Sequence, residues 1–291
     1  MNSVNRKKVI LFVVLTYLID WSMVVIFMLR GGKWNSSSAL MLSLFYMLVP
    51  MLVTIVFQKY IYKENMKEQY GLSFKVNKWF LAAWLLPALL AFAALGVALL
   101  LPGVHFSPDM SGMIERFSHY LTPEQMQQLR HKMATMTIHP LWLTLFQGLF
   151  AGATINAVVA FGEELGWRGF LQKELGGLGF WRSSFLIGII WGLWHAPLVL
   201  HGLNYPQHPV AGIYMMTIWA VLLSPIIAYI RLRAKSVLAA AVMHGTLNAT
   251  YGISIMVVSG GSDLTVGLTG LAGFIVLIVA NLILYYSVSE Y

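Results

Sequence analysis

The residues best suited to chemistry in this chain are carboxylates and histidines that lie within long apolar stretches. Glu163 and Glu164 directly follow an apolar segment, and Arg168 comes four residues after Glu164. On a helix, Glu164 and Arg168 share a face and can pair, whereas Glu163 projects about 100° away. Glu163 is therefore free to act as a general base. The alternative for this segment is a helix end with interfacial charges and one ordinary ion pair.

Two further apolar stretches each place a histidine one helical turn from a second polar or aromatic residue. His195 follows Trp191 by four residues, and His244 precedes Asn248 by four. An imidazole can accept a proton, donate a hydrogen bond or ligate a metal, and an asparagine amide can donate to a developing oxyanion. Each pair alone is also explained by hydrogen bonding between helices. Together, the three segments favour hydrolytic chemistry.

The amino-acid composition indicates the class of protein that positions these groups. Of the 291 residues, 58% are hydrophobic and only 10% are charged, and the mean hydropathy is +0.72. Lipid can solvate this much apolar surface, but a water-soluble fold cannot hide it. The chain has no cysteine, which excludes disulfides, thiolate metal sites and a cysteine nucleophile. The formal charge of +8 comes with no motif for nucleic acid, so no nucleic-acid partner is expected.

Apolar runs of about 20 residues, the length that crosses a bilayer as a helix, recur along the chain. The runs are interrupted by polar connections and lack the alternation typical of strands. The sequence therefore predicts an all-α integral membrane protein, a bundle of about eight transmembrane helices that forms a single polytopic domain over residues 1–291. The expected spans cover residues 9–30, 39–57, 79–101, 140–161, 183–201, 210–230, 237–258 and 266–288.

The basic residues indicate how these spans are oriented. Loops on the cytoplasmic side carry an excess of lysine and arginine. With both termini in the cytoplasm, the outside holds only Arg30, Lys33, Arg116, Arg130 and Lys132. The inside then holds Arg6, Lys7, Lys8, Lys59, Lys63, Lys67, Lys75, Lys78, Arg168, Lys173, Arg182, Arg231, Arg233 and Lys235. We therefore expect a multi-pass protein of the cell (plasma) membrane with both termini cytoplasmic.

The longest polar segment, residues 102–139, then lies outside the membrane. Thr122, Pro123 and Gln125 form a helix start, with threonine as N-cap and proline in the first turn. We expect an amphipathic helix on the outer membrane surface. In the first span, Asp20 is expected to bond a polar group of a neighbouring helix or to contact the site.

The depths of the candidate residues impose a geometric requirement. At 1.5 Å per residue, His195 lies about 20 Å beyond Arg182, and His244 lies about 13 Å beyond Lys235. Glu163 would lie near the end of its span. Straight vertical helices would not bring the three together, so we expect a tilted or displaced fourth helix, or a wet cavity.

The three segments resemble the motifs of one family of membrane proteins. Glu163-Glu164-x-x-x-Arg168 is similar to an E-E-x-x-x-R motif, and His244-x-x-x-Asn248 to an H-x-x-x-N/D motif. Trp191-x-x-x-His195 is similar to an F-x-x-x-H motif, with tryptophan in place of phenylalanine. These motifs are typical of the CPBP intramembrane endopeptidases, which include the type II CAAX prenyl proteases and the bacterial Abi proteins. The resemblance covers about residues 140–260.

The resemblance implies an eight-helix core with an active site inside the membrane, reached from the cytoplasmic side. It implies that Glu163 activates the attacking water with assistance from His195. It also implies that His244 and Asn248 stabilise the oxyanion. Glu164 and Arg168 would form a structural or substrate-positioning pair, with Trp191 in a supporting role.

The use of a metal remains open at this point. The family is often labelled metalloprotease, and Glu163, His195 and His244 could hold Zn²⁺ with water in the fourth position. The same residues also work without a metal, with the glutamate as base. Either no cofactor or zinc is therefore expected.

The leading functional hypothesis is an endopeptidase that cleaves a peptide or membrane-protein substrate near the cytoplasmic membrane face, surrounded by membrane lipid. A bacteriocin leader, a peptide pheromone or a protein tail would suit such an enzyme. One alternative is a proton-coupled transporter, because buried glutamate and histidine also relay protons. Another is a non-catalytic bacteriocin-immunity or scaffold protein.

Overall fold

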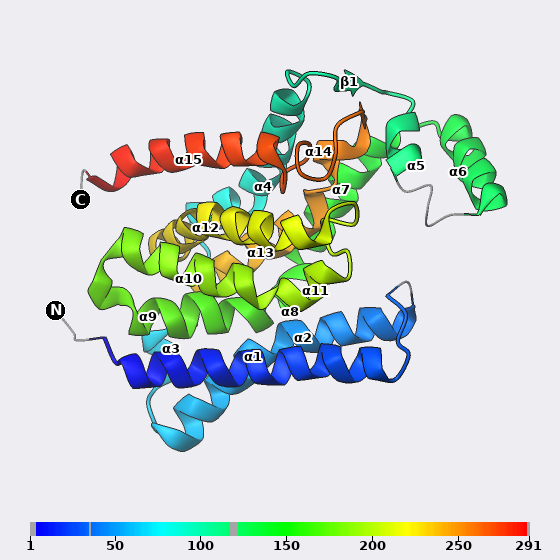
Figure 1. Cartoon of the computed structure of the whole chain (residues 1–291). Coiled ribbons are helices and arrows are strands. Elements are labelled where there is room, and N and C mark those ends of the chain that lie inside the picture. Colours follow the sequence, from blue (N-terminus) through cyan, green and yellow to red (C-terminus); the bar gives the residue numbers. More distant parts are fainter. Residues whose placement is uncertain (1–3, 35, 117–121, 290–291) are drawn as a thin grey trace.

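Helices form nearly all of the regular structure in the computed structural model of the chain, which describes residues 4–34, 36–116 and 122–289 (Figure 1). The helices of the first half are α1 (Arg6–Leu29), α2 (Ser37–Val56), α3 (Met66–Gln69), α4 (Lys78–Ala98), α5 (Ser111–Arg116), α6 (Pro123–Thr135) and α7 (Pro140–Ala153). Those of the second half are α8 (Ile155–Glu164), α9 (Gln172–Glu174), α10 (Phe180–Trp194), α11 (Ala196–Leu200), α12 (Pro209–Ala234), α13 (Val237–Thr250), α14 (Ile253–Met256) and α15 (Leu271–Ser289). Two-residue strands β1 (His105–Phe106) and β2 (Val258–Ser259) pair antiparallel.

The outer surface of the bundle suits lipid rather than water. Ile10, Leu18 and Val25 of α1 are each more than half exposed, although they are large and apolar. Because lipid tails can cover such side chains and water would not, the all-α membrane bundle predicted from composition is confirmed. The chain is a multi-pass membrane protein.

Within the described residues, four helical segments are long and apolar enough to cross a membrane: α1, α2 with its π-helical end, α4 and α12. A fifth is counted when α7 and the helix that follows it, bent by 53°, are taken as one span. The remaining apolar helices are shorter than the predicted spans, because breaks in the helical backbone interrupt or end them early. The segment expected at 183–201 breaks at His195, and the one expected at 237–258 ends as α13 at Thr250.

The break at His195 has a visible cause in the sequence. Pro197 stands in the first turn of α11, where its missing N–H is tolerated, but it cannot continue α10. The bend between α7 and α8 has no comparable signal in the sequence. It falls at Thr154, whose backbone leaves the helical region with φ −119° and ψ −99°.

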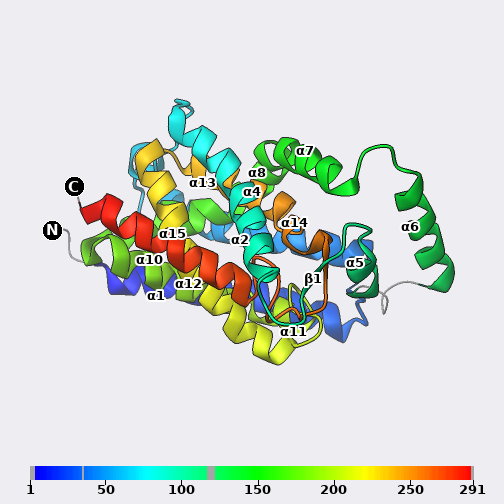
Figure 2. The same ribbon diagram turned by 90° about the horizontal axis from the view of Figure 1, so that it is seen from above.

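Close helix contacts pack α8 between α2 and α13, and α7 lies beyond α8 in the direction away from both termini (Figure 2). Gly245 of α13 lies so close to α8 that an added Cβ would stand 2.5 Å from the backbone nitrogen of Ala157. Gly162 of α8 is similarly tight, with a built Cβ 2.5 Å from the backbone oxygen of Met47 in α2. Glycine at these two positions therefore lets three helices approach backbone to backbone.

The predicted outer helix forms as α6, and its start has the expected cap. Thr122 Oγ1 accepts from the Gln125 backbone N–H at 3.3 Å, and Gln125 Oε1 accepts from the Thr122 N–H at 2.9 Å. The helix lies beyond the end of the bundle that is opposite the chain termini (Figure 1). Residues 117–121 of the predicted outer segment lie outside the described residues.

Candidate active site

The first element of the site is the helix that carries the two adjacent glutamates. After the 53° bend at Thr154, α8 runs through Glu163 and Glu164 into a π-helical segment, Leu165–Leu171, and then into α9. The span therefore does not end near Glu163, as we expected, but continues to Glu174. The bend and the continuation together meet the requirement for a displaced fourth helix. Single π-helical turns of this kind often occur at functional sites.

Glu163 is held by two indole groups. Its side chain is buried, with 2% of its surface exposed. Its Oε2 accepts a hydrogen bond from Trp191 Nε1 at 2.7 Å and one from Trp167 Nε1 at 3.3 Å. An indole N–H can only donate, so both bonds fix Oε2 as an acceptor and leave Oε1 for another partner.

Glu164 joins two other predicted site residues. Its Oε1 accepts from Arg168 Nη1 at 3.0 Å, which is the ion pair predicted from the spacing. The same oxygen accepts from His244 Nδ1 at 2.8 Å. Because a carboxylate oxygen accepts here, Nδ1 carries the hydrogen and Nε2 of His244 is directed elsewhere. Glu164 and Arg168 are fully buried.

His195 occupies the break between α10 and α11. Its Nδ1 lies 2.7 Å from the carbonyl oxygen of Trp191, one turn back in α10. A carbonyl oxygen only accepts, so this bond places the hydrogen on Nδ1 and leaves the lone pair of a neutral ring on Nε2. This hydrogen bond, made where α10 ends and α11 begins, thus fixes the ring orientation of His195.

Trp191 is the residue that the other groups share. Its indole bonds Glu163, and its ring centroid lies 5.6 Å from that of His195 and 5.4 Å from that of His244. The guanidinium carbon of Arg168 lies 4.6 Å from the indole centroid, within cation–π range. The supporting role predicted for Trp191 therefore understates how many site residues it contacts.

A cavity of about 200 Å³ brings most of the predicted residues together. Glu163, Trp191, His195, His244 and Asn248 all line it. Glu164 and Arg168 do not line it but lie behind His244. The other walls come from α2, the end of α10, α11, the loop after α11, α12 and the residue after α13. They are formed by Ser43, Tyr46, Met47, Trp194, Leu198, Leu203, Asn204, Met216, Trp219 and Tyr251.

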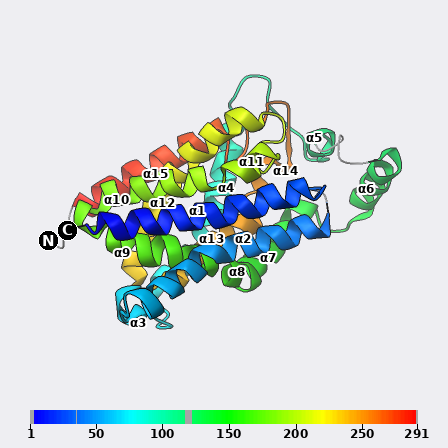
Figure 3. The ribbon, with the colours of Figure 1, turned by 60° about the horizontal axis from the view of Figure 1, so that its bottom comes forward.

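Side chains of α1 and α2, which lie side by side, hold the end of α10 in place (Figure 3). Asp20 Oδ2 accepts from Trp194 Nε1 at 2.6 Å. The carbonyl oxygen of Trp194 accepts from Tyr46 Oη at 2.5 Å and from Trp21 Nε1 at 3.2 Å. These contacts were not predicted from the sequence, except that Asp20 was expected to bond a neighbouring helix. The isolated carboxylate within an apolar span was the available signal.

Glu163, His195 and His244, which were considered above as zinc ligands, do not form a preassembled three-ligand cluster. In the part of the chain that the structure describes, no three histidine, aspartate or glutamate side chains form a group that could hold a metal ion. Glu163 Oε2 faces two indole N–H groups, and both histidines direct Nδ1 at oxygen atoms. These bonds leave Nε2 of each histidine directed elsewhere, so the use of a metal stays a prediction.

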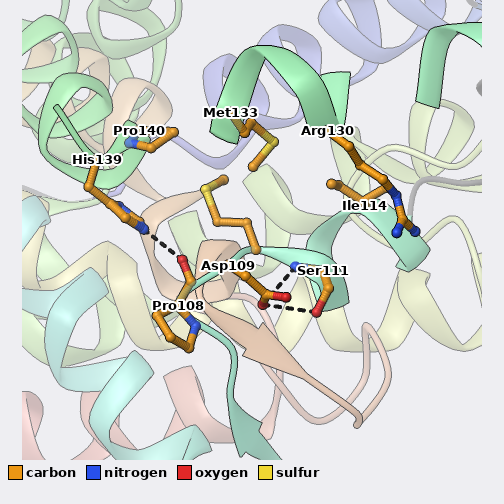
Figure 4. A pocket seen from close by; sticks show the side chains of 9 residues that line it. Pro108, Asp109, Ser111, Ile114, Arg130, Met133, His139 and Pro140 are labelled. Atoms are coloured by element: carbon orange, nitrogen blue, oxygen red, sulfur yellow. Dashed lines mark hydrogen bonds between the residues drawn. The ribbon is translucent and has the colours of Figure 1, made fainter. Parts of the chain in front are cut away.

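A different cavity, of about 270 Å³, lies between α5, α6 and the start of α7 (Figure 4). Its polar side chains are engaged with nearby backbone and hydroxyl groups. His139 Nε2 lies 2.7 Å from the Pro108 carbonyl oxygen, and Asp109 accepts from the backbone and the hydroxyl of Ser111 (Figure 4). This cavity therefore lacks the converging groups that distinguish the first.

Comparison with known proteins connects this site to a family. Residues 137–250 match the family described as "Type II CAAX prenyl endopeptidase Rce1-like". A segment of 96 residues is 32% identical to "CAAX prenyl protease 2" from Methanococcus maripaludis. The alignment covers 30% of this chain and 34% of that protein, so the match spans about a third of the relative's length. The resemblance to CAAX proteases predicted from three motifs is confirmed, and the matched segment contains Glu163, His195 and His244.

Proposed function

We propose that this chain, whose residues 137–250 belong to the Rce1-like family, is an intramembrane endopeptidase that uses a water molecule activated by Glu163. The observation that supports this most is that Glu163, His195 and His244, from three separate helical segments, line one small cavity. A base and two imidazoles around a common space are the groups that peptide hydrolysis requires.

In the proposed reaction, Glu163 takes a proton from water while the water oxygen bonds to the carbonyl carbon of the scissile peptide. His195 assists through Nε2, which accepts a hydrogen bond from the same water. The carbon–nitrogen bond then breaks, and the proton held by Glu163 passes to the leaving amine. The products are a carboxylic acid, which keeps the second proton of the water, and an amine; transfer of that proton from the acid to the amine gives a carboxylate and an ammonium group, and no metal takes part in any step.

In this proposal the oxyanion of the tetrahedral intermediate is stabilised by the side-chain amide of Asn248 and by His244 as an imidazolium, which donates from Nε2 while Nδ1 donates to Glu164. Both residues lie on one face of α13 and line the cavity. The bond from His244 Nδ1 to Glu164 holds the ring in position, and Arg168 balances the charge of Glu164. Donors fixed before the reaction begins stabilise developing charge without a cost of reorientation.

The proposed substrate is a peptide or a membrane-protein tail, and the proposed location is the plasma membrane with both termini cytoplasmic. Maturation of a bacteriocin leader or an immunity role would be biological uses of the same activity. Cleavage near the cytoplasmic face, as the family resemblance implies, would require the cavity to open at the end of the bundle that carries the termini.

The experiment compares the wild type with Glu163→Gln in proteoliposomes. The probes are a farnesylated peptide that ends in a C-a-a-X sequence and the same peptide without the lipid, with products identified by mass spectrometry. Loss of the base should lower the cleavage rate by about 10²–10⁴-fold. Glu124→Gln, in α6 outside the cavity, is the matched control and should cleave normally.

Three outcomes are informative. Equal cleavage by Glu163→Gln and the wild type would contradict the role of Glu163. Proton flux that is lost in Glu163→Gln, with no cleavage by either protein, would indicate a transporter instead. Cleavage that is lost on dialysis against a chelator and restored by zinc would contradict the metal-free mechanism.

A further inference from the structure

The cavity lies in the half of the bundle that is far from both chain termini. In α2 its lining residues are Ser43, Tyr46 and Met47, within the first eleven residues of a 20-residue helix that begins at Ser37. In α12 they are Met216 and Trp219, within the first eleven residues of a 26-residue helix that begins at Pro209. Both helices begin at the end opposite the N- and C-termini (Figures 1 and 3).

The opening of the cavity is formed by residues at that same end. Leu203 is 40% exposed and Tyr251 is 38% exposed, and Asn248 is exposed as well. Leu203 and Asn204 belong to the connection between α11 and α12, and Tyr251 follows the last residue of α13. The exposed part of the cavity wall is therefore formed by the end of α13 and by connections at the end away from the termini.

A second cavity extends this opening toward the surface. It measures about 240 Å³ and shares Leu203, Asn204 and Tyr251 with the first. Its other walls include Arg116, the last residue of α5, and Asp263 in the connection between β2 and α15. Because they share these lining residues, the two cavities adjoin at this end of the bundle.

Basic residues assign this end to the outside. At the end with the termini, the connection between α2 and α4 alone carries Lys63, Lys67 and Lys75, and the turn between α12 and α13 carries Lys235. At the opposite end, the connections of the described chain carry only Arg30, Lys33, Arg116, Arg130 and Lys132. Arg168 does not bear on orientation, because it is fully buried beside Glu164. Because cytoplasmic connections are enriched in lysine and arginine, the termini are cytoplasmic.

We infer that the cavity opens on the extracytoplasmic face, so that the peptidase acts on peptide segments exposed outside the cytoplasm. This inference rests on the proposed peptidase function for its substrate, but the side on which the cavity opens can be measured without any activity. It replaces the cytoplasmic access expected from the family resemblance. The substrate class becomes an extended segment of a secreted peptide or of a membrane protein, on the side away from the chain termini.

The absence of cysteine from the chain makes a direct test possible, because one introduced thiol is then the only one. Leu203→Cys and Asn204→Cys place a thiol at the opening, and Lys67→Cys places one at the other end. Each variant is treated with a membrane-impermeant maleimide in bacterial spheroplasts, and again after permeabilisation. We expect Leu203→Cys and Asn204→Cys to label in intact spheroplasts at least about tenfold more than Lys67→Cys, which should label only after permeabilisation.

Two results would overturn the inference. One is labelling of Leu203→Cys and Asn204→Cys only after permeabilisation, which would place the opening in the cytoplasm. The other is thiols that react after denaturation but from neither side of the native protein, which would show that the opening is closed to water. Failure of the proposed peptidase function would be distinguishable from failure of this inference. Normal cleavage by Glu163→Gln would contradict the role of Glu163, but it would leave the labelling pattern of the cysteine variants unchanged.

Discussion

The indole nitrogen of Trp191 donates a hydrogen bond to Glu163 Oε2 over 2.7 Å, so the aromatic residue of one motif holds the carboxylate of another. The two residues are 28 positions apart in sequence and lie on different helices. A phenylalanine, which the related motif has at this position, can fill the space but cannot donate. Trp191 therefore gives this chain a direct link between the α10 motif and the proposed base.

Trp191→Phe tests the value of that link. Hydrogen bonds to charged groups are worth about 1.5–3 kcal/mol, so we expect peptide cleavage to fall by about 10–100-fold. The measurement is kcat and KM in proteoliposomes, with the main change in kcat. Trp219→Phe is the matched control, because Trp219 touches Trp191 but its buried Nε1 has no partner among the described residues. Equal losses in the two variants would mean that ring packing alone matters.

Loss of the ion pair between Glu164 and Arg168 should lower the free energy of unfolding. Arg168→Met would leave the Glu164 carboxylate buried without its cation, which costs about 3–5 kcal/mol. We expect thermal unfolding in detergent to show this loss, and the double variant with Glu164→Gln to recover much of it. The recovered double variant should still cleave slowly, because His244 loses the carboxylate that orients it. A double variant as unstable as Arg168→Met would refute the pairing argument.

The sequence was sufficient to predict most helix positions and the chemical groups of the site. Spans such as α1, α4 and α12 are long, continuous and apolar, so their boundaries follow from length and hydropathy alone. The Glu164–Arg168 pair follows from helical spacing. The position of the bend at Thr154 was not predicted, because neither proline nor glycine stands at that residue to mark it, and the close approach of Gly152 to Thr246 of α13 is a contact between distant segments.

Contacts between segments that are far apart in the sequence could not be predicted either. Spacing within a helix shows which residues share a face, but it does not show which other helix that face meets. The bonds from Trp191 to Glu163 and from Trp194 to Asp20 join segments that only the folded bundle brings together. A polar partner for Asp20 could still be predicted, because an isolated carboxylate in an apolar span requires one.

Gly245→Ala should distort the site through packing. The added Cβ would stand 2.5 Å from the backbone nitrogen of Ala157, so α13 must move away from α8. Overpacking of this kind costs about 1–3 kcal/mol. We expect a lower unfolding temperature and weaker cleavage, because His244 is the neighbouring residue. Gly96→Ala in α4, where a Cβ meets open space, is the control and should leave both unchanged or raise stability slightly.

Asp20→Leu should loosen the end of α10. Trp194 Nε1 would lose its acceptor, and a buried donor without a partner costs about 1–3 kcal/mol. Asp20→Asn retains an oxygen that can accept the bond, so it should recover most of the stability and the cleavage rate. Thr16→Val is a control on the same helix, because the buried Thr16 hydroxyl has no partner among the described residues. A loss in Asp20→Asn as large as in Asp20→Leu would show that the carboxylate charge, not the hydrogen bond, is required.

The contribution of Glu64 to stability should depend on pH. Glu64 accepts from Lys8 at 3.0 Å and from Lys173 at 2.9 Å, which ties the connection after α2 to α1 and α9. Partial burial acts to raise the pKa of Glu64, but the hydrogen bonds from Lys173 and Lys8 outweigh it and hold the pKa below its ordinary value of 4.5. A pKa that is lower in the folded state means that the stabilisation is complete above the unfolded-state pKa and is lost as the pH falls through the folded-state pKa.

Thermal unfolding of the wild type and Glu64→Gln, measured from about pH 7 to about pH 3, checks this dependence. Because the Glu64 side chain is 33% exposed, solvent screening limits the expected difference to about 1 kcal/mol at neutral pH. The two unfolding curves should converge at the acidic end, since a protonated carboxyl no longer attracts either lysine. A difference that persists unchanged at low pH would show that Glu64 acts through packing or neutral hydrogen bonds and that its charge contributes nothing.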